Sequence, residues 1–251
     1  GVLCRCTGYR KILDAVCDAW REGPSSPPPQ GPVGARIDRL DGAAKVAGDS
    51  FGADVVPDNA LVVKAVRSPH AHAAFDFGDL AAFKARPGIA AVFLAADIPG
   101  RNAFSVIPPF ADQPAIAFSP SRFRGECVAL VAFEPGVDPD LTDFPLTWIP
   151  LPALLTPADA EAPDAVLLHA SRPRNLLIEG KVCKGDAVAA LAASAFVVEG
   201  SFRTAYVEHA YIEPEAGAAW MDGDVLCIRA CTQAPVMDRD DTAIILGLPQ
   251  D

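Results

Sequence analysis

The segment REGPSSPPPQGP, residues 21–32, constrains the fold of this chain more than any other stretch. Its proline, serine and glycine residues offer no apolar side chain around which a core could form, and its run of three prolines favours an extended conformation. A short helix is expected before it, over residues 8–20, because apolar residues recur there at spacings of three and four: Ile12, Leu13, Val16, Cys17 and Trp20. The chain is therefore expected to divide at this segment.

Composition narrows the class of protein. The net charge of −11 argues against a nucleic-acid-binding surface and against docking on anionic lipid. No apolar run reaches the roughly 18 residues of a membrane span, and no apolar signal-peptide region follows the basic N-terminal residues. Most of the seven cysteines stand singly in apolar segments, which predicts reduced, buried and inert thiols in a cytoplasmic protein: Cys17, Cys127, Cys183, Cys227 and Cys231.

Beyond residue 32 the pattern is that of an α+β protein with mixed sheets and helices packed to one side. Runs rich in β-branched and aromatic residues, bounded by Pro, Gly or Asp, predict strands over 61–68, 89–98, 127–133, 145–151 and 197–206. An alternating stretch predicts a hairpin over 218–232 with its turn at Asp222-Gly223. Helices are predicted over 78–88, 184–196 and 239–249.

Cys4 and Cys6, one residue apart, allow three interpretations from their spacing alone. They could be incidental thiols before a helix, which is the commonest case for a lone pair. They could be half of a zinc site, although a second pair at ordinary zinc spacing is absent. They could be half of an iron–sulfur site, which needs four thiolates.

The residues around this pair distinguish the three. GVLCRCTGYRKILDA, residues 1–15, closely resembles the last segment of the two-cluster [2Fe-2S] domain of the molybdenum hydroxylases, the family of xanthine dehydrogenases and aldehyde oxidoreductases. The resemblance implies that Cys4 and Cys6 bind the second [2Fe-2S] cluster as part of a ligand set, at the start of a helix whose amide groups face the anionic cluster. An earlier Cys-x2-Cys pair would supply the other two ligands, so the chain is expected to be a fragment.

The resemblance continues in order along almost the whole chain. Residues 35–55 and 61–75 are similar to the start of the family's a/b hammerhead domain, and 185–220 to the start of its first molybdopterin-binding subdomain. It implies four parts: the end of the [2Fe-2S] domain over 1–22, a Pro-rich linker over 23–35, the hammerhead domain over 36–150 and the N-terminal part of the molybdopterin-binding domain over 151–251.

The histidines allow a second metal hypothesis. His70 and His72 would share one face of a strand, but no third ligand is evident and Pro69 ends the strand, so a turn or a domain contact is the favoured role. The resemblance also implies a structural role for this pair. His169 is expected on the surface or in a loop.

YVEHAYIEPEAG, residues 206–217, is the predicted cofactor segment. A buried strand end with satisfied polar groups is the simpler interpretation. The resemblance implies instead that Val207, Glu208 and His209 lie beside the molybdenum–pterin cofactor. Many members of the family have Gln where this chain has Val207, and valine cannot donate the corresponding hydrogen bond.

The resemblance implies an oxidoreductase that oxidises an aldehyde or an N-heterocycle with water as oxygen source and passes electrons to [2Fe-2S] clusters. The family's catalytic Glu would lie beyond residue 251, so no catalytic residue is expected here and the isolated chain is expected to be inactive. Its expected partners are the small-molecule substrate, the missing cofactor-binding segments and an electron-transfer or FAD-carrying chain. A non-catalytic assembly module and a small metal-binding protein are the two alternatives.

Overall fold

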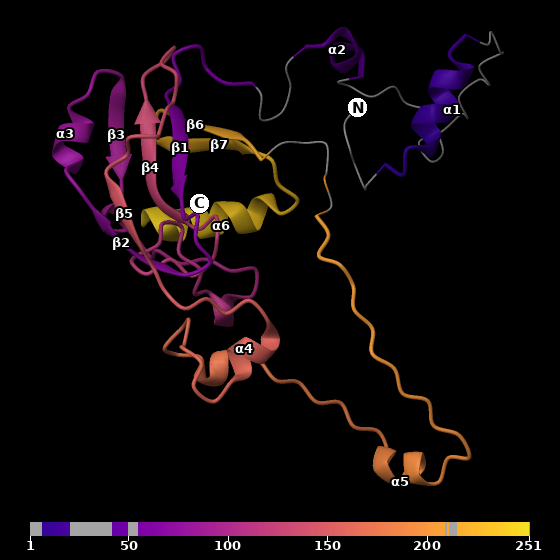
Figure 1. Ribbon diagram of the computed structural model, residues 1–251. Helices are drawn as coiled ribbons and strands as arrows, with labels where there is room; N and C mark the ends of the chain where they lie inside the picture. The colour runs from indigo at the N-terminus through magenta and orange to yellow at the C-terminus, as the bar shows by residue number, and fades with distance from the viewer. Residues whose placement is uncertain (1–6, 21–41, 50–54, 209, 211–214, 251) are drawn as a thin grey trace. The chain divides into compact units, whose positions relative to one another are not determined.

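A computed structural model describes residues 7–20, 42–49, 55–208, 210 and 215–250 (Figure 1). Two compact units can be distinguished. One comprises Pro57–Gly185 with Thr232–Asp251, and the other combines the chain up to Val56 with Asp186–Cys231. Each unit is described by itself. Within the described ranges, no helix is long and apolar enough to cross a membrane.

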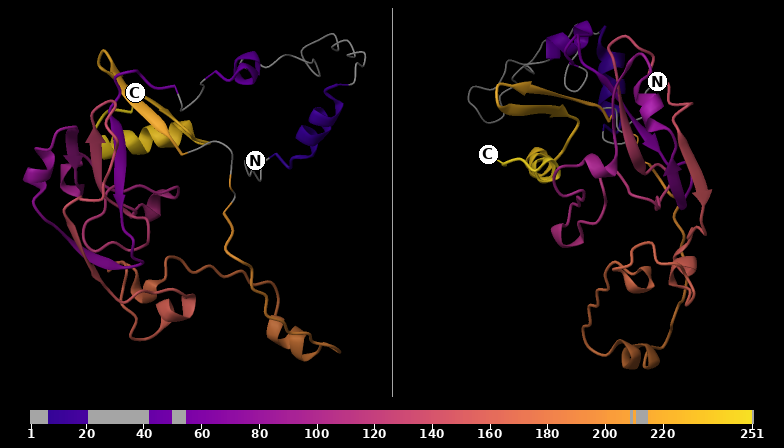
Figure 2. Two further views of the ribbon diagram at one scale, coloured as in Figure 1. Left: turned by 45° about the horizontal axis from the view of Figure 1, so that its top comes forward. Right: turned by 90° about the vertical axis from the view of Figure 1, so that its left-hand side faces the viewer.

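The first unit is built on an antiparallel sheet of order β1-β4-β3 (Figures 1 and 2). The central strand β4 (Cys127–Phe133) coincides with its predicted limits, and β1 (Val62–Arg67) lies within its predicted range. Strand β3 (Ile89–Phe93) is shorter than predicted, because the chain turns into a 3-10 helix over Ala95–Asp97. The Asp97 carboxylate caps this helix by accepting a hydrogen bond from the Leu94 amide at 2.7 Å.

A second pair of antiparallel strands, β2 (Ala73–Phe77) and β5 (Leu146–Pro150), adjoins this sheet. Helix α3 (Leu80–Lys84) begins at Asp79, whose carboxylate accepts from the Ala82 amide at 2.9 Å. The core lies among these elements and contains a chain of edge-to-face aromatic rings. Its buried members include Val66, Phe75, Phe83, Val92, Val128, Val131, Phe133 and Phe144.

Helix α6 (Pro235–Leu246) completes this unit. It begins four residues before its predicted start, because Pro235 occupies the first turn, where proline needs no amide partner. The amides of Gly100 and Arg101 donate to the carbonyls of Ile245 and Ile244, at 2.9 and 3.1 Å, and so attach its C-terminal end to the segment after β3. Short helices also occur at α4 (Pro157–Glu161) and in 3-10 form at Pro108–Phe110 and Pro173–Asn175.

The second unit contains separate helices and one hairpin. Helix α1 (Arg10–Asp18) confirms the predicted N-terminal helix, and α5 (Ala187–Ala192) confirms the core of the predicted 184–196 helix. Helix α2 (Gly42–Ala47) was not predicted. The hairpin of β6 (Gly217–Asp222) and β7 (Val225–Ala230) is confirmed, with its turn one residue later than predicted, at Gly223 and Asp224.

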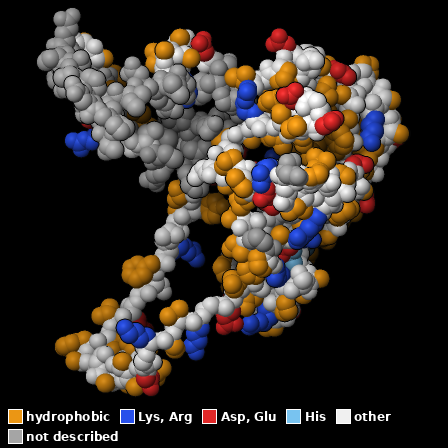
Figure 3. Space-filling model, turned by 180° about the vertical axis from the view of Figure 1, so that it is seen from behind, with side chains coloured by type: hydrophobic (Ala, Val, Ile, Leu, Met, Phe, Trp, Pro, Cys, Tyr) orange, Lys and Arg blue, Asp and Glu red, His pale blue; other side chains and the backbone are white. Residues whose placement is uncertain are grey.

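The predicted strand over 197–206 is wrong, because these residues form neither a helix nor a strand. They are extended without a described pairing partner, and a strand exists only where its amides and carbonyls pair with a neighbour. Figure 3 shows hydrophobic side chains along this part of the chain, at the lower left. Among them Phe196, Val198 and Phe202 are more than nine-tenths exposed.

The prediction that the single cysteines are buried is also wrong. Cys17 and Cys183 are exposed, while Cys127, Cys227 and Cys231 are only partly buried. Cys17 lies on the short helix α1 and Cys183 in a segment without regular structure, and neither element is covered by other described residues.

Candidate functional site

Of the predicted site residues, the structure describes Val207 and Glu208. Cys4, Cys6 and His209 lie outside the described residues. Val207 is 63% exposed and Glu208 is exposed, both at the end of the extended segment. Within the part of the chain that the structure describes, no three His, Cys, Asp or Glu side chains lie close enough together to hold a metal ion.

The two described residues of the predicted cofactor segment, Val207 and Glu208, do not by themselves enclose a molybdenum–pterin cofactor. The Val207 side chain is apolar and largely exposed, so it offers neither a hydrogen bond nor an enclosed wall. A site for a polar cofactor needs convergent donors around a concave surface, and segment 197–208 is extended and exposed.

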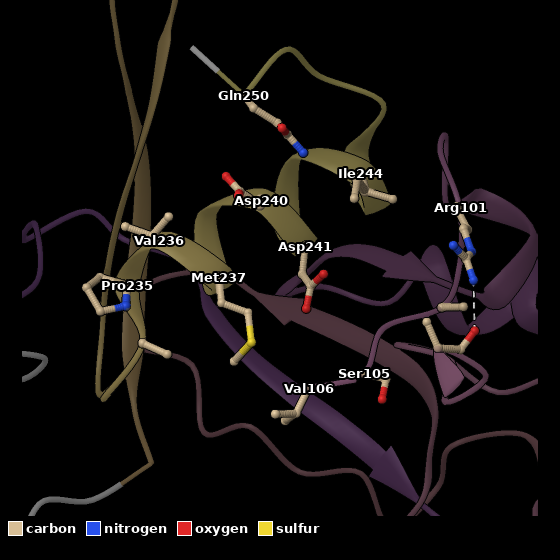
Figure 4. A pocket seen from close by; sticks show the side chains of 13 residues that line it. Arg101, Ser105, Val106, Pro235, Val236, Met237, Asp240, Asp241, Ile244 and Gln250 are labelled. Atoms are coloured by element: carbon tan, nitrogen blue, oxygen red, sulfur yellow. Dashed lines mark hydrogen bonds between the residues drawn. The ribbon is translucent and has the colours of Figure 1, made fainter. Parts of the chain in front are cut away.

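A concave site lies instead between α6 and the segment that follows β3. Its volume is about 650 Å³, and its lining comes from residues 101–111 and from 234–250 (Figure 4). All of these residues belong to one compact unit. Most of the lining is apolar, and its polar side chains are Arg101, Ser105, Asp240, Asp241 and Gln250.

The wall formed by residues 101–111 is fixed by hydrogen bonds. The Asn102 amide group donates to the Ile116 carbonyl at 2.7 Å, and its oxygen accepts from the Ala115 and Ile116 amides at 2.9 and 3.3 Å. The Arg101 guanidinium donates to the Ala111 carbonyl at 2.9 Å, which Figure 4 shows as a dashed line. These bonds hold both ends of the loop, so the wall is formed before any ligand arrives.

The two carboxylates of α6 that line the pocket differ in their surroundings. Asp240 accepts two bonds from the Arg239 guanidinium, at 2.6 and 2.8 Å. Asp241 makes no hydrogen bond or ion pair with any described residue. Figure 4 shows the Asp241 carboxylate on the same side of the helix as Met237, facing Ser105 and Val106, whereas Asp240 leaves the helix on the other side.

A buried polar network lies elsewhere in the same unit and is fully satisfied. The Ser121 hydroxyl donates to the Ser68 hydroxyl at 2.9 Å, and the Arg122 amide donates to the Glu126 carboxylate at 2.5 Å. Among the described residues, no buried side-chain polar atom lacks a partner. A satisfied network of this kind specifies the packing of loops and leaves no group poised for chemistry.

The two histidines that were considered as metal ligands, His70 and His72, have structural contacts. The His72 Nδ1 lies 2.8 Å from the Pro152 carbonyl, so this nitrogen carries the proton, and the ring is buried. The His70 ring packs edge-to-face on Trp148 at 5.9 Å. The favoured structural interpretation of this pair agrees with these contacts.

His169, expected on the surface or in a loop, lies beside a partly buried ion pair. Its Nδ1 lies 3.8 Å from the Asp112 carboxylate, which also accepts from the Arg172 guanidinium at 3.1 Å. Arg122 donates to the Leu168 carbonyl at 2.9 Å beside this ion pair. Together these bonds attach residues 168–172 to the loop before β4.

Cys127, at the start of β4, has a perturbed thiol. Burial raises its pKa above the ordinary thiol value, and the positive charge of Arg67 offsets only part of this effect. The neutral thiol is therefore the dominant form at neutral pH, which disfavours a nucleophilic role.

Sequence reasoning missed the pocket residues Arg101, Ser105 and Asp241. Nothing in the local pattern distinguishes them, because the two walls are about 130 residues apart in the chain and meet only in the fold. The sequence PGRN at 99–102 carried a usable signal, since a Pro-Gly pair after a strand indicates a sharp turn beside another element.

Two sequence families match this chain. Residues 50–135 match the family described as "Aldehyde oxidase and xanthine dehydrogenase, a/b hammerhead domain". Residues 168–251 match the family described as "Molybdopterin cofactor-binding domain". The pocket thus has one wall in each matched region.

Individual proteins agree with this assignment. The aldehyde oxidoreductase of Megalodesulfovibrio gigas is 29% identical over 248 residues, covering 89% of this chain and 27% of the relative. The nicotinate dehydrogenase large molybdopterin subunit of Eubacterium barkeri is 31% identical over 218 residues, covering 84% of this chain and 50% of the relative. The crystal structure of the aldehyde oxidoreductase from Desulfovibrio desulfuricans superposes with a TM-score of 0.82 at 25% identity, over 98% of this chain and 30% of that protein. The chain thus spans about a quarter to a half of the length of these relatives.

Proposed function

Because this chain belongs to the molybdenum hydroxylase family of aldehyde oxidoreductases and xanthine dehydrogenases, we propose that it forms the hammerhead domain and the first part of the molybdopterin-binding domain of such an enzyme. The proposed reaction is the oxidation of an aldehyde or an N-heterocycle, with water as the oxygen source and [2Fe-2S] clusters as electron acceptors. When bound, the molybdenum cofactor supplies the two-electron chemistry.

One observation carries this proposal: segments from the two matched regions are joined within one compact unit. The hammerhead residues Gly100 and Arg101 bind the C-terminal end of α6, and Asp112 binds Arg172 at 3.1 Å. Residues 168–251 are thus attached to the hammerhead at two places far apart in the sequence. The role of this chain would be to hold the start of the cofactor-binding domain in a fixed position.

We propose Cys4 and Cys6 as ligands of a [2Fe-2S] cluster, and Val207, Glu208 and His209 as neighbours of the cofactor. The motif around the cysteines and the collinear family match support these assignments. The proposed limits are 1–22 for the cluster domain, 23–35 for the linker, 36–150 for the hammerhead and 151–251 for the cofactor domain. An FAD-carrying or other electron-transfer partner would accept the electrons.

The complete gene product, purified from a host that makes molybdenum cofactor, tests this function. We expect bound molybdenum, oxidation of benzaldehyde or a simple N-heterocycle with a dye acceptor, and transfer of ¹⁸O from labelled water to the product. A molybdenum-loaded product without such activity would contradict the reaction. A product that is pure and folded but contains no molybdenum would favour the assembly-module alternative.

The cluster assignment has a separate test. Cys4→Ser and Cys6→Ser, made in the complete gene product, should each remove or distort one [2Fe-2S] signal in electron paramagnetic resonance and retain the other, because each cluster needs its own thiolates. Cys183→Ser is the control, since this exposed thiol lies outside the motif. Unaltered signals in both motif variants would refute the assignment.

A further inference from the structure

The pocket between α6 and residues 101–111 contains a carboxylate that the fold does not use. Asp241 lines the pocket and has no described hydrogen-bond or ion-pair partner, while the neighbouring Asp240 is held by Arg239 at 2.6 Å. Asp241 is only partly exposed, so water compensates its charge less completely than on an open surface.

The surroundings of Asp241 are apolar on the side that faces the pocket. Met237 lies one helical turn before it, and Val106 lies on the opposite wall (Figure 4). Residues spaced by four on a helix share a face, which places the thioether and the carboxylate side by side. The Ser105 hydroxyl accepts from the Ile107 amide at 3.2 Å and keeps its proton to donate.

Among the described residues that line the pocket, Arg101 is the one cation, and it does not neutralise the Asp241 carboxylate. The Arg101 guanidinium donates to the Ala111 carbonyl at 2.9 Å, and no ion pair joins it to Asp241. A ligand that carries its own positive charge would therefore complete the electrostatics of the pocket. The excess of acidic over basic residues in the chain, 32 against 21, favours the approach of such a ligand.

We propose that this pocket is a binding site for a small organic cation, an ammonium group attached to an apolar or aromatic body. The ammonium would donate to the Asp241 carboxylate, and the apolar body would pack between Met237 and Val106. A pocket of about 650 Å³ with few convergent polar groups has the size and character of a small-molecule site. The site is independent of the molybdenum chemistry proposed above.

The test uses three probes of nearly equal shape: benzylamine, which is protonated at pH 7, neutral benzyl alcohol and anionic benzoate. Dissociation constants are measured by ligand-observed NMR on the purified protein. We expect benzylamine to bind about tenfold more tightly than benzyl alcohol, because a charge-assisted hydrogen bond is about twice as strong as a neutral one. Benzoate should bind most weakly of the three.

Asp241→Asn should remove this preference, reducing the ratio to about twofold or less, since the amide keeps the shape but not the charge. Asp238→Asn is the matched control: it removes an exposed carboxylate of the same helix that does not line the pocket, and the tenfold preference should remain. Circular dichroism confirms that each variant is folded.

A second variant decides the matter if Asp241→Asn does not fold. Val106 is 76% exposed, so Val106→Lys should fold, and its tethered ammonium should compete with benzylamine and weaken its binding. Equal affinities for the three probes, equal losses in the Asp238 and Asp241 variants, or undiminished benzylamine binding in Val106→Lys would each overturn the proposal.

Discussion

Among the described glycines of its compact unit, Gly100 is the one whose added Cβ atom would come closest to a neighbouring atom, at the end of α6. A Cβ atom at Gly100 would lie 2.1 Å from the Ile244 carbonyl oxygen, 2.7 Å from the Gly247 nitrogen and 2.8 Å from the Ile245 carbonyl oxygen. All three are backbone atoms, so no side-chain rotation can relieve the clash. Gly100→Ala must therefore separate α6 from this segment.

The cost follows from the bonds that the separation breaks. The Gly100 amide to Ile245 and the Arg101 amide to Ile244 are both lost, and each is worth about 1 kcal/mol net. Carbonyls left without donors and reduced packing around the buried Ala243 add to this loss. We expect a loss of about 2–4 kcal/mol, against a gain of only about 0.4–1 kcal/mol from the lower chain entropy of alanine in the unfolded state.

Urea unfolding measures the free energy, and amide hydrogen exchange measures the local effect on α6. Exchange should accelerate in α6 more than in β4. Gly180→Ala is the matched control, because Gly180 is exposed and a Cβ atom there would meet nothing within 4 Å. If Gly100→Ala and Gly180→Ala have the same stability and the same α6 protection, the close approach does not hold the helix and the reasoning is refuted.

Three further outcomes follow. Iodoacetamide should alkylate Cys127 more slowly than the exposed Cys183, because burial raises the Cys127 pKa and lowers its thiolate fraction. The Cys127 rate should rise at higher pH, and equal rates for the two cysteines in mass spectrometry would contradict this. Asn102→Ala should destabilise the protein by about 2–4 kcal/mol in urea unfolding, because it leaves a buried Ile116 carbonyl and two amides without partners. Asn102→Asp should also destabilise it, because a carboxylate oxygen would replace the amide donor that faces the Ile116 carbonyl; unchanged stability of both variants would refute the bridging role. Val207→Gln in the complete gene product should change turnover or substrate preference per molybdenum; unchanged constants across several aldehydes and purines would exclude its proposed place beside the cofactor.

Local sequence patterns were sufficient for the elements whose partners lie in the same unit. Strand β4 was predicted at its exact limits because it is central, apolar on both faces and bounded by turns. The hairpin of β6 and β7 was predicted from its alternating pattern and the Asp222-Gly223 pair, and Gly223 adopts a φ of 59° in the turn. In these cases the information that determines the element lies within a few residues of it.

The pocket could not be predicted, because its walls come from two distant stretches. Asp241 has the same local neighbourhood as Asp240 in the sequence, yet only Asp240 is paired with Arg239. The difference arises from the helical rotation of 100° between adjacent residues and from the side on which α6 meets residues 101–111. The helical period predicts the angle between Asp240 and Asp241. The side of α6 that meets residues 101–111 depends on the close approach of Gly100, which only the folded structure reveals.

The wrong prediction of a strand over 197–206 shows what local composition cannot determine. Its β-branched and aromatic residues have the composition of a strand, but composition expresses a preference for a pleated, half-buried surface and cannot supply one. Phe202 is 97% exposed and Tyr206 is fully exposed, so the described residues provide neither a neighbouring strand nor a covering layer. The same argument bears on Val207, one residue further: its proposed place beside a cofactor requires a surface that encloses it. A test of that place must therefore be made in the complete gene product, where an enclosed Val207 would be protected from solvent and the 63% exposure seen here would fall.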